Sequence, residues 1–597
     1  MRFRSKRWAA MVTTEARADS AVSIKTRPEA FHVNRTSSDE LSAQRRLVEA
    51  LRRPEAYSHT VDEITLVETH ISFVLLTGRY AYKIKKAVDY EFLDFTTLAR
   101  RRFYCEEELR LNRLLAPHLY LDVVAITGSV QDPRMSGDGV VLDYAVRMRQ
   151  FDQDALLSRL VESDALISEH IDSLASVVAS FHSQTTKAPE TTQCGAPGEV
   201  RKPARQNFDQ MLAVLTDSND LRDLEALRAW TEKEYVRRGA LLSKRRRGFI
   251  RECHGDLHLN NIALIDGKVS LFDRIEFNES MRWIDVTSDV AFLVMDLHER
   301  GRPDLGARFL NRYLEITGDY EGVALLPFYL TYRAMVRAKI ACLRMNQVVS
   351  AEIRAASRDE YRQYIRLAKS HGRQRPALVL MHGLAGSGKT TMSEHLMQRV
   401  CAIRLRTDIE RKRIHGLEAE AQTDSPVARG IYTDVDTQRV YGRICVLARA
   451  IAEAGFVAIA DGAFLKRWER DLFRKAAASM NVPFIIVDCT APLHTLRRRV
   501  AERLASHHDP SEATIAVLEA QLAVQEPLAP DERPAVVSGE DEFIGWFDRQ
   551  YPARPSGATT FPRWILKSTR KYATARGVAT NHQASAVRRL ASGTTLL

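Results

Sequence analysis

The spacing of apolar residues divides the first 370 positions into two regions. Residues 64–90 alternate apolar and polar side chains around a turn at Thr77–Gly78, which predicts a β-hairpin. Apolar residues recur at helical spacing over Phe95–Leu115, and Val140–Met148 has the pattern of another strand. Longer helical patterns cover residues 154–183, 205–242, 304–317 and 323–370. A β-rich lobe followed by a helical lobe is therefore expected.

The pattern changes after residue 376 to an alternation of strands and helices. Four short apolar runs predict strands, at Ala377–Met381, Ala402–Leu405, Phe456–Ala460 and Phe484–Asp488. Helical patterns separate these runs, and two more follow at Leu496–Arg503 and His507–Leu528. This order predicts an α/β domain with a mainly parallel sheet. None of the apolar runs approaches the ~20 residues that a membrane-spanning helix needs.

Two stretches interrupt the pattern. Thr185–Pro203 is rich in Pro, Gly and Thr, which predicts a loop. Ser370–Arg375 is short and polar, and it directly precedes the first strand of the α/β region. We therefore expect the boundary between two domains there, with the first over residues 45–370 and the second over residues 376–548.

Charge is concentrated at the two ends of the 597-residue chain. The net charge is +11, but residues 1–38 carry eight Lys or Arg against three acidic residues, and residues 549–597 carry nine against none. The body between them is therefore slightly acidic, which argues against nucleic-acid binding by the folded core. We expect a disordered basic leader over 1–44 and a flexible basic tail over 549–597, with a short helix at Trp564–Tyr572.

The seven cysteines argue against a disulfide framework. Their number is odd, and no two of them form a C-x-x-C pair. This usage is typical of a protein of the reducing cytoplasm, and it does not predict a zinc ribbon.

A first group of chemically informative residues lies in the run His254-Gly-Asp-Leu-His-Leu-Asn-Asn261, between two apolar segments. Phosphoryl transfer needs a carboxylate beside the attacking hydroxyl and hard oxygen ligands for Mg²⁺. Asp256 and Asn261, five residues apart, supply both from one loop. Asp273, at the end of the following apolar strand, would complete the metal site.

This run resembles the catalytic loop of the aminoglycoside phosphotransferases and the related choline- and homoserine-kinase-like enzymes. The resemblance covers about residues 60–340 and implies the two-lobed α+β fold of protein kinases. It implies that Asp256 is the catalytic base and that Asn261 and Asp273 are Mg²⁺ ligands. It also implies structural roles for Asp285 and Asp289, which follow the loop.

The same resemblance implies roles for residues of the β-rich lobe. Lys83 corresponds to the lysine that binds the α- and β-phosphates of ATP, and Glu108 to its ion-pair partner. Lys85 stays an alternative to Lys83, because the two share a strand face. Glu106 and Glu107 stay alternatives to Glu108, because they directly precede it. The glycine-rich loop of protein kinases is missing, which is usual among aminoglycoside-phosphotransferase-like enzymes.

The first group of residues allows two other interpretations. His254 and His258 are four residues apart, which would suit two zinc ligands on one helical face, but no third ligand at suitable spacing is apparent. A catalytically inactive kinase fold is the second. The presence of Asp256, Asn261 and Asp273 together weighs against it.

A second group is a complete G-x-x-x-x-G-K-[ST] motif placed between a predicted strand and a predicted helix. Its glycines allow backbone N–H groups to surround phosphates, Lys389 reaches the β- and γ-phosphates, and Thr390 binds Mg²⁺. The nucleotide-binding residues expected from the motif are Gly383, Ala385, Gly386, Ser387, Gly388, Lys389, Thr390 and Thr391.

Two acidic residues follow predicted parallel strands, where an open α/β sheet places its ligands: Asp408 and Asp461. The region resembles small P-loop kinases such as gluconate kinase, chloramphenicol phosphotransferase, polynucleotide kinase and zeta-toxin relatives. This resemblance implies that Asp408 deprotonates the acceptor hydroxyl, that Arg411 binds the acceptor, and that Asp461 lies near Mg²⁺. Arg499 and Arg503, four apart on a basic helix, are expected to form a catalytic lid, although a solvated basic helix explains them equally well.

The order of the two regions resembles bacterial fusions of an aminoglycoside phosphotransferase with an ATP-binding protein. We expect a cytoplasmic kinase whose two modules use ATP and Mg²⁺ to phosphorylate a hydroxyl of a small molecule. Two alternatives stay open. One is a polynucleotide or RNA-end kinase that uses the basic tails, which is possible but not favoured. The other is a regulatory protein in which one module only senses ATP.

Overall fold

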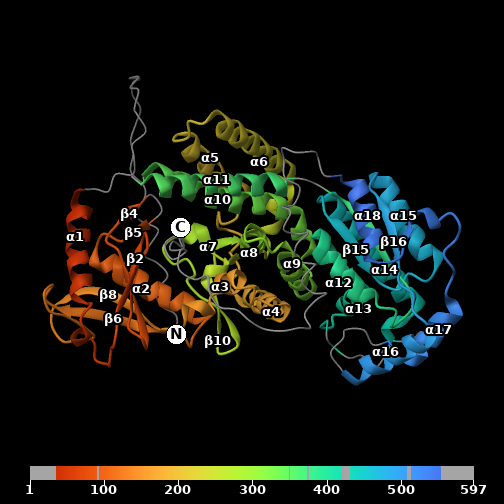
Figure 1. The fold of residues 1–597 in the computed structure, drawn as a ribbon, viewed down its shortest axis with the longest axis horizontal. Helices are drawn as coiled ribbons and strands as arrows, with labels where there is room; N and C mark the ends of the chain where they lie inside the picture. The colour runs from red at the N-terminus through yellow and green to blue at the C-terminus, as the bar shows by residue number, and fades with distance from the viewer. Residues whose placement is uncertain are drawn as a thin grey trace, which may run out of the picture.

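The computed structural model describes residues 35–90, 93–347, 350–372, 375–419, 421, 430–506 and 513–552. Figure 1 shows three parts in chain order: a β-rich lobe, a helical lobe beside it, and an α/β domain at the far end. The predicted fold class, a kinase-like α+β unit followed by a P-loop unit with a mainly parallel sheet, is confirmed. The helix predicted at Trp564–Tyr572 lies outside the described residues.

The β-rich lobe is built on an antiparallel sheet of six strands in the order β1-β2-β3-β8-β6-β7. The predicted hairpin is present as β2 and β3, and it turns at Gly78, whose φ of +86° favours glycine. The strands are β1 (Thr65–Glu68), β2 (Ser72–Leu76), β3 (Tyr80–Lys85), β6 (Tyr120–Gly128), β7 (Pro133–Met135) and β8 (Val141–Arg149), and a short pair, β4 (Asp89–Tyr90) and β5 (Leu93–Asp94), lies outside this sheet.

Two helices accompany this sheet. Helix α2 (Leu98–Arg113) begins where the Thr97 side chain accepts the N–H of Arg100, and it packs against β6 and β8. Helix α1 (Arg35–Ala50) begins nine residues before the expected end of the leader, so the boundary placed at residue 44 falls inside a helix. Its buried Leu47 and Val48, with Leu51 directly after it, join the apolar core of this lobe, which explains why the chain is already folded there.

The helical lobe differs from the predicted pattern in four places. Pro197 starts α5 inside the stretch expected to be a loop, because a proline at the first helical position costs no hydrogen bond. Three predicted helices are each split in two: the first of them, over 154–183, after Glu162, the one over 205–242 at an Asp217 cap, and the one over 323–370 after residue 347. The helices are α3 (Leu157–Glu162), α4 (Ser168–Gln184), α5 (Pro197–Leu212), α6 (Ser218–Arg245), α7 (Glu279–Arg282), α8 (Val286–Glu299), α9 (Pro303–Thr317), α10 (Leu326–Gln347) and α11 (Ala351–His371).

Short strands in the helical lobe carry the first group of candidate site residues. Strand β9 (Ile250–Glu252) pairs with β12 (Trp283–Asp285), and β10 (Ile262–Ile265) pairs with β11 (Lys268–Leu271). The run from His254 to Asn261 connects these two ladders.

The α/β domain contains a parallel sheet of five strands in the order β14-β15-β13-β16-β17. Its strands are β13 (Ala377–His382), β14 (Ile403–Arg406), β15 (Val457–Asp461), β16 (Phe484–Asp488) and β17 (Val536–Val537). Its helices are α12 (Lys389–Val400), α13 (Thr407–Ile414), α14 (Asp434–Glu453), α15 (Arg467–Met480), α16 (Leu493–Ser506), α17 (Ile515–Val524) and α18 (Glu540–Gln550). The end expected at residue 548 falls inside α18, whose buried Phe543 and Phe547 pack on this domain.

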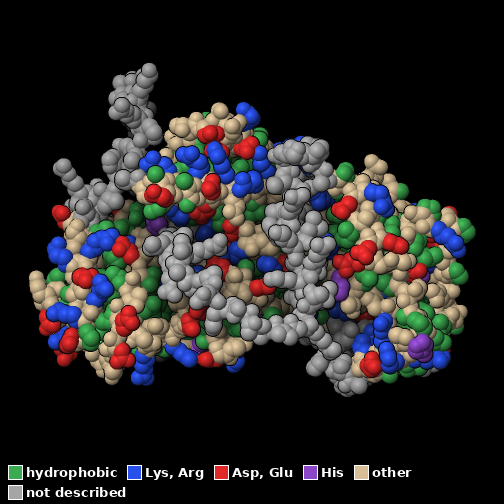
Figure 2. Space-filling model, viewed as in Figure 1, with side chains coloured by type: hydrophobic (Ala, Val, Ile, Leu, Met, Phe, Trp, Pro, Cys, Tyr) green, Lys and Arg blue, Asp and Glu red, His purple; other side chains and the backbone are tan. Residues whose placement is uncertain are grey.

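The largest apolar core continues from the helical lobe into the α/β domain. It contains side chains of α8, α9 and α10 together with side chains of β13, β14, β15 and α14. On the visible surface, acidic and basic side chains are interspersed over both ends of the molecule (Figure 2), in keeping with the small charge of the body. Within the described residues, no helix has both the length and the apolarity that a membrane span requires.

Candidate active sites

The loop from His254 to Asn261 brings the expected base and an expected metal ligand together. The Asn261 side-chain amide donates a hydrogen bond of 3.0 Å to Asp256 Oδ2, and His258 Nε2 lies 3.2 Å from the same oxygen. Gly255 has a φ of +85°, and a Cβ there would lie 2.7 Å from the Met281 carbonyl oxygen. Only glycine therefore fits at the position before Asp256.

The carboxyl of Asp256 is ionised throughout the physiological pH range. Burial acts to raise its pKa, but the neighbouring imidazoles of His258 and His254 and the guanidinium of Arg337 outweigh burial and hold the pKa at about 2. Such a group is a strong hydrogen-bond acceptor for a hydroxyl, and it takes up a proton only late in a reaction.

Asp273 follows β11 and faces the same cleft. Its backbone has a φ of +62°, which is uncommon for a residue other than glycine, and its N–H donates a 3.0 Å hydrogen bond to the buried Tyr120 hydroxyl. Its carboxylate is paired with Lys83. The cavity between the β-rich lobe and the loop has a volume of about 200 Å³, and Lys83, Asp256, Asn261 and Asp273 all line it.

A buried ion-pair network connects Lys83 to α2. Lys83 Nζ lies 2.9 Å from Glu108 Oε1, and Lys85 Nζ lies 2.7 Å from the other oxygen, Oε2. Lys85 also pairs with Glu276. The two lysines left open by the sequence thus share one carboxylate, but Lys83 alone contacts Asp273, while the Lys85 side chain is fully buried.

The choice among the three acidic residues of α2 is also clear from their contacts. Glu108 is buried and contacts Lys83, whereas Glu106 pairs with Arg102 and Glu107 with Arg110. Burial acts to raise the pKa of Glu108, but Lys83 and Lys85 outweigh it and lower the pKa below its usual value.

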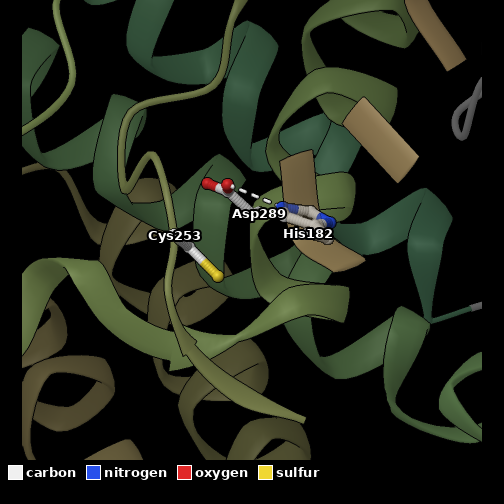
Figure 3. Close-up of side chains that lie close together, drawn as sticks. All are labelled: His182, Cys253 and Asp289. Carbon is white, nitrogen blue, oxygen red and sulfur yellow. Dashed lines mark hydrogen bonds and ion pairs between the residues drawn. The ribbon is translucent and has the colours of Figure 1, made fainter. Parts of the chain in front are cut away.

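A buried polar cluster supports the loop from behind (Figure 3). Asp289 Oδ2 accepts the backbone N–H of His254 and Oδ1 accepts that of Gly255, each at 3.0 Å. His182 Nε2 lies 3.2 Å from Asp289 Oδ2. Cys253 lies beside them, and burial raises the pKa of its thiol well above the usual value, so it stays protonated. We interpret this cluster as a support for the loop.

The structure does not favour the zinc interpretation of His254 and His258. His254 Nε2 is 2.9 Å from the Phe272 carbonyl oxygen, while His258 faces Asp256. Among the described residues, the group with metal-ligand spacing is His182, Cys253 and Asp289 instead. The sequence did not predict this group, because its members are far apart in the chain.

The P-loop connects β13 to α12 in the expected context. Gly383 has a φ of +139°, and a Cβ there would lie 2.2 Å from the Cys489 carbonyl oxygen. Gly386 and Gly388 also have positive φ values, of +79° and +95°. Lys389 Nζ donates to the Leu384 carbonyl at 2.7 Å across the loop. Ser387 is buried next to Lys389, which begins α12, and Thr390 and Thr391 follow in the first turn of that helix.

The two acidic residues of this domain lie at the carboxyl ends of neighbouring strands. Asp461 ends β15 and accepts a 2.9 Å hydrogen bond from Ser393, while Asp408 lies in the first turn of α13, directly after β14. Burial lowers the pKa of the Lys389 amine, and the nearby carboxylates of Asp461 and Asp408 oppose that change. Asp461 is paired in the sheet with Met381, just before the P-loop, and with Arg406, just before Asp408, so the two acidic residues and the P-loop lie at the same edge of the sheet.

The three expected arginines have different surroundings. Arg499 Nη1 donates to the Gly386 carbonyl at 3.3 Å, so it lies over the P-loop, and Arg503 donates to the Ala513 carbonyl at 3.1 Å. Arg411 is buried, donates to the Ile431 carbonyl at 3.0 Å, and lies 4.8 Å from the ring centroid of Tyr432. Both contacts of Arg411 are therefore with residues of its own domain.

One contact at the P-loop was not predicted. The Gln521 side chain on α17 accepts the backbone N–H of Ala385 at 2.8 Å. The sequence indicated only a helix there, because a glutamine carries no motif signal.

Both sites offer ligands that suit Mg²⁺, a hard cation that prefers oxygen donors. In the first site these are the carboxylate of Asp273 and the side-chain oxygen of Asn261. In the second they are the Thr390 hydroxyl, at the start of α12, and the Asp461 carboxylate, which is buried beside that helix. The donor chemistry therefore fits the ion in both places.

Comparison with protein families agrees with this division. Residues 96–326 match the model of the phosphotransferase enzyme family, and residues 378–528 match the model of an AAA domain. The chain joins a phosphotransferase-family domain to an AAA domain. It is thereby a phosphotransferase, as predicted.

Uncharacterized proteins of Mycobacterium tuberculosis and Mycobacterium bovis are 29% identical to this chain over 464 residues, which is 77% of this chain and 90% of each relative. Among solved structures, a choline kinase of Cryptosporidium parvum is 11% identical, with a TM-score of 0.32 over 52% of this chain and 89% of its own. A gluconokinase of Sinorhizobium meliloti is 17% identical, with a TM-score of 0.21 over 33% of this chain and 99% of its own.

Proposed function

We propose that this phosphotransferase has two separate active sites, each of which transfers the γ-phosphoryl group of ATP to a hydroxyl of a small molecule. The observation that carries the proposal is the convergence of Lys83, Asp256, Asn261 and Asp273 on one cavity, together with the placement of the P-loop, Asp408 and Asp461 at one edge of the parallel sheet. We further propose that the first catalytic unit extends from α1 to α11 and the second from β13 to α18.

In the first site, Lys83 binds the phosphates of ATP, and Glu108 keeps the Lys83 amine charged and oriented. Asp256 accepts a hydrogen bond from the acceptor hydroxyl and orients its oxygen toward the γ-phosphorus. As the new O–P bond forms and the bond to the β-phosphate oxygen breaks, the hydroxyl proton passes to Asp256 and ADP leaves. The low pKa of Asp256 places this proton transfer late in the step.

In the second site, the P-loop N–H groups and Lys389 bind the phosphates, and Asp408 accepts the hydroxyl proton. Arg499 lies on α16 over the loop, and Arg503 is one turn further along the same helix; both would balance charge on the transferring group. Asn261 and Asp273 in the first site, and Thr390 and Asp461 in the second, would hold Mg²⁺, which when bound neutralises charge on the β- and γ-phosphates.

We place the protein in the cytoplasm, where ATP is available. All seven cysteines lie in the described part of the chain, and each is a free thiol there. Free thiols at these positions support a reducing compartment.

The test is incubation of the full chain with labelled ATP and a metabolite pool, followed by mass spectrometry for new phosphate esters. Asp256→Ala and Lys389→Ala are compared with two surface controls, Asp266→Asn and Lys475→Ala. We expect each site variant to remove a different product and the controls to remove none. If both site variants still form every product, the proposal is contradicted.

The same experiment distinguishes the alternatives. If one variant changes nucleotide binding without removing a product, that domain is a nucleotide sensor. If the products are phosphorylated nucleic-acid ends, and binding of the nucleic acid weakens steeply with salt and on deletion of the basic tail, the protein is a polynucleotide kinase.

A further inference from the structure

Helix α9 of the first domain packs against the edge of the second domain's sheet. Strand β14 is the edge strand, and the buried Asn311 side chain makes two hydrogen bonds with the backbone at the start of this strand. Asn311 Nδ2 donates to the Ala402 carbonyl at 2.8 Å, and Asn311 Oδ1 accepts the Arg404 N–H at 2.6 Å. These two hydrogen bonds hold α9 and the edge strand in one register. Figure 1 shows α9 beside α12 at the junction of the domains.

One helical turn further along α9, Glu315 makes a buried ion pair across the same junction. Its Oε1 lies 2.9 Å from Arg404 Nη2, and the two side chains are only 4% and 7% exposed. Burial acts to raise the pKa of Glu315, but Arg404 and Arg406 outweigh burial and lower it, so the carboxylate is ionised. A pair this well buried orients both of its members, because either charge alone would be strongly destabilising.

Arg404 continues from this pair to the second site. Its Nη1 lies 3.4 Å from the Ser393 hydroxyl and 3.5 Å from the Thr390 carbonyl oxygen. Ser393 donates a 2.9 Å hydrogen bond to Asp461 Oδ2. A chain of buried contacts thus runs from a carboxylate of the first domain to the proposed Mg²⁺ ligands of the second.

We propose that Glu315 is a positioning residue of the second active site, supplied by the first domain. It orients Arg404, which holds Ser393, and Ser393 fixes the Asp461 carboxylate in the orientation that Mg²⁺ binding needs. This inference rests on the proposed function of the P-loop domain. It makes the second site incomplete without α9, although α9 contributes no residue to the P-loop itself.

The test measures binding of a fluorescent ATP analogue to the full chain, with Lys83→Ala present so that only the second site binds. In this background, Glu315→Gln keeps the shape of the side chain but removes its charge. We expect the Mg²⁺ concentration at half-saturation to rise roughly tenfold, the size of effect usual for groups that orient metal ligands. Nucleotide binding without Mg²⁺ should stay unchanged, because it depends on the P-loop itself.

Glu321→Gln is the matched control, because Glu321 is a half-exposed carboxylate of the first domain that pairs with Lys244 and not with the second domain. It should leave the Mg²⁺ requirement unchanged. If Glu315→Gln does not fold, Ser393→Ala gives the same test from within the second domain, since it removes the hydroxyl and leaves the Glu315–Arg404 pair intact. Here too we expect a rise in the Mg²⁺ requirement.

An unchanged Mg²⁺ requirement in a folded variant would overturn the inference. So would an equal loss of binding with and without Mg²⁺, which would indicate a merely structural role. If the Lys83→Ala chain binds no nucleotide at all, the proposed function of the second site fails instead, so the two failures are distinguishable.

Discussion

Lys83 Nζ lies 2.9 Å from Glu108 Oε1, and the other oxygen of that carboxylate is bound by Lys85. Neighbouring positions on one strand face thus have different surroundings. Lys83 faces the cavity and Asp273, while Lys85 is enclosed with Glu276. The sequence leaves both lysines as candidates, but their contacts separate them.

This difference predicts opposite effects for the two lysines. Lys83→Met should reduce product formation at the first site by roughly 10²–10³-fold, because a charge aimed at the phosphates is lost. Lys83→Met should lower the free energy of unfolding less than Lys85→Met does, because Glu108 keeps its ion pair with Lys85. Lys85→Met should instead lower the free energy of unfolding by about 3–5 kcal/mol, because Glu276 loses its buried partner. Denaturant unfolding and rate measurements on both variants check this; equal effects of the two on stability would contradict it.

Tyr120 is expected to position Asp273. Tyr120→Phe removes the acceptor of the Asp273 N–H, at a residue with an unfavourable positive φ, and should cost about 1–3 kcal/mol of stability. We expect the rate at the first site to fall about tenfold, with the second site unaffected. Tyr57→Phe is the control, since Tyr57 donates to the Leu51 carbonyl in the same lobe away from Asp273. It should lower stability without changing the rate.

The P-loop should tolerate no side chain at Gly383. Gly383→Ala would place Cβ against the Cys489 carbonyl oxygen, so we expect nucleotide binding at the second site to be lost in the full chain. Gly442→Ala, in the middle of α14 with open space around it, should instead be neutral or stabilise by up to about 1 kcal/mol. Equilibrium nucleotide binding and thermal melting test the pair; tight binding by the Gly383 variant would refute the assignment.

Glu469 is expected to make stability depend on pH. Burial raises its pKa from 4.5 to about 7, so the folded protein binds this proton more tightly than the unfolded chain does. Its contribution is fully present below pH 4.5 and is lost as pH rises through 7, by on the order of 2–3 kcal/mol. Glu469→Gln should therefore stabilise the protein at pH 8 relative to wild type, and the advantage should shrink toward pH 5. Unfolding free energies at the two pH values measure this, and an advantage that does not depend on pH would argue against it.

The sequence predicted the elements that carry local motifs. Strand β16 and the P-loop context of β13 and α12 follow from apolar runs and from glycine spacing, which are local signals. The break between α10 and α11 and the start of α5 at Pro197 did not follow, because tertiary packing and capping decide them. The Lys83–Glu108 pair was expected through the family resemblance. The second contact of Glu108, with Lys85, the group around Asp289 and the Gln521 contact at the P-loop depend on residues that meet only in the folded chain.

The shared apolar core has a consequence for how this protein can be handled and how it can evolve. Helices α8, α9 and α10 bury side chains in the same cluster as β13 and α14. Cutting the polypeptide near residue 373 would therefore leave each half with a large exposed hydrophobic surface. Separately expressed fragments should aggregate unless they are produced together and reassemble. If the two domains descend from independent enzymes, the shared core means that neither domain would now be stable without the other.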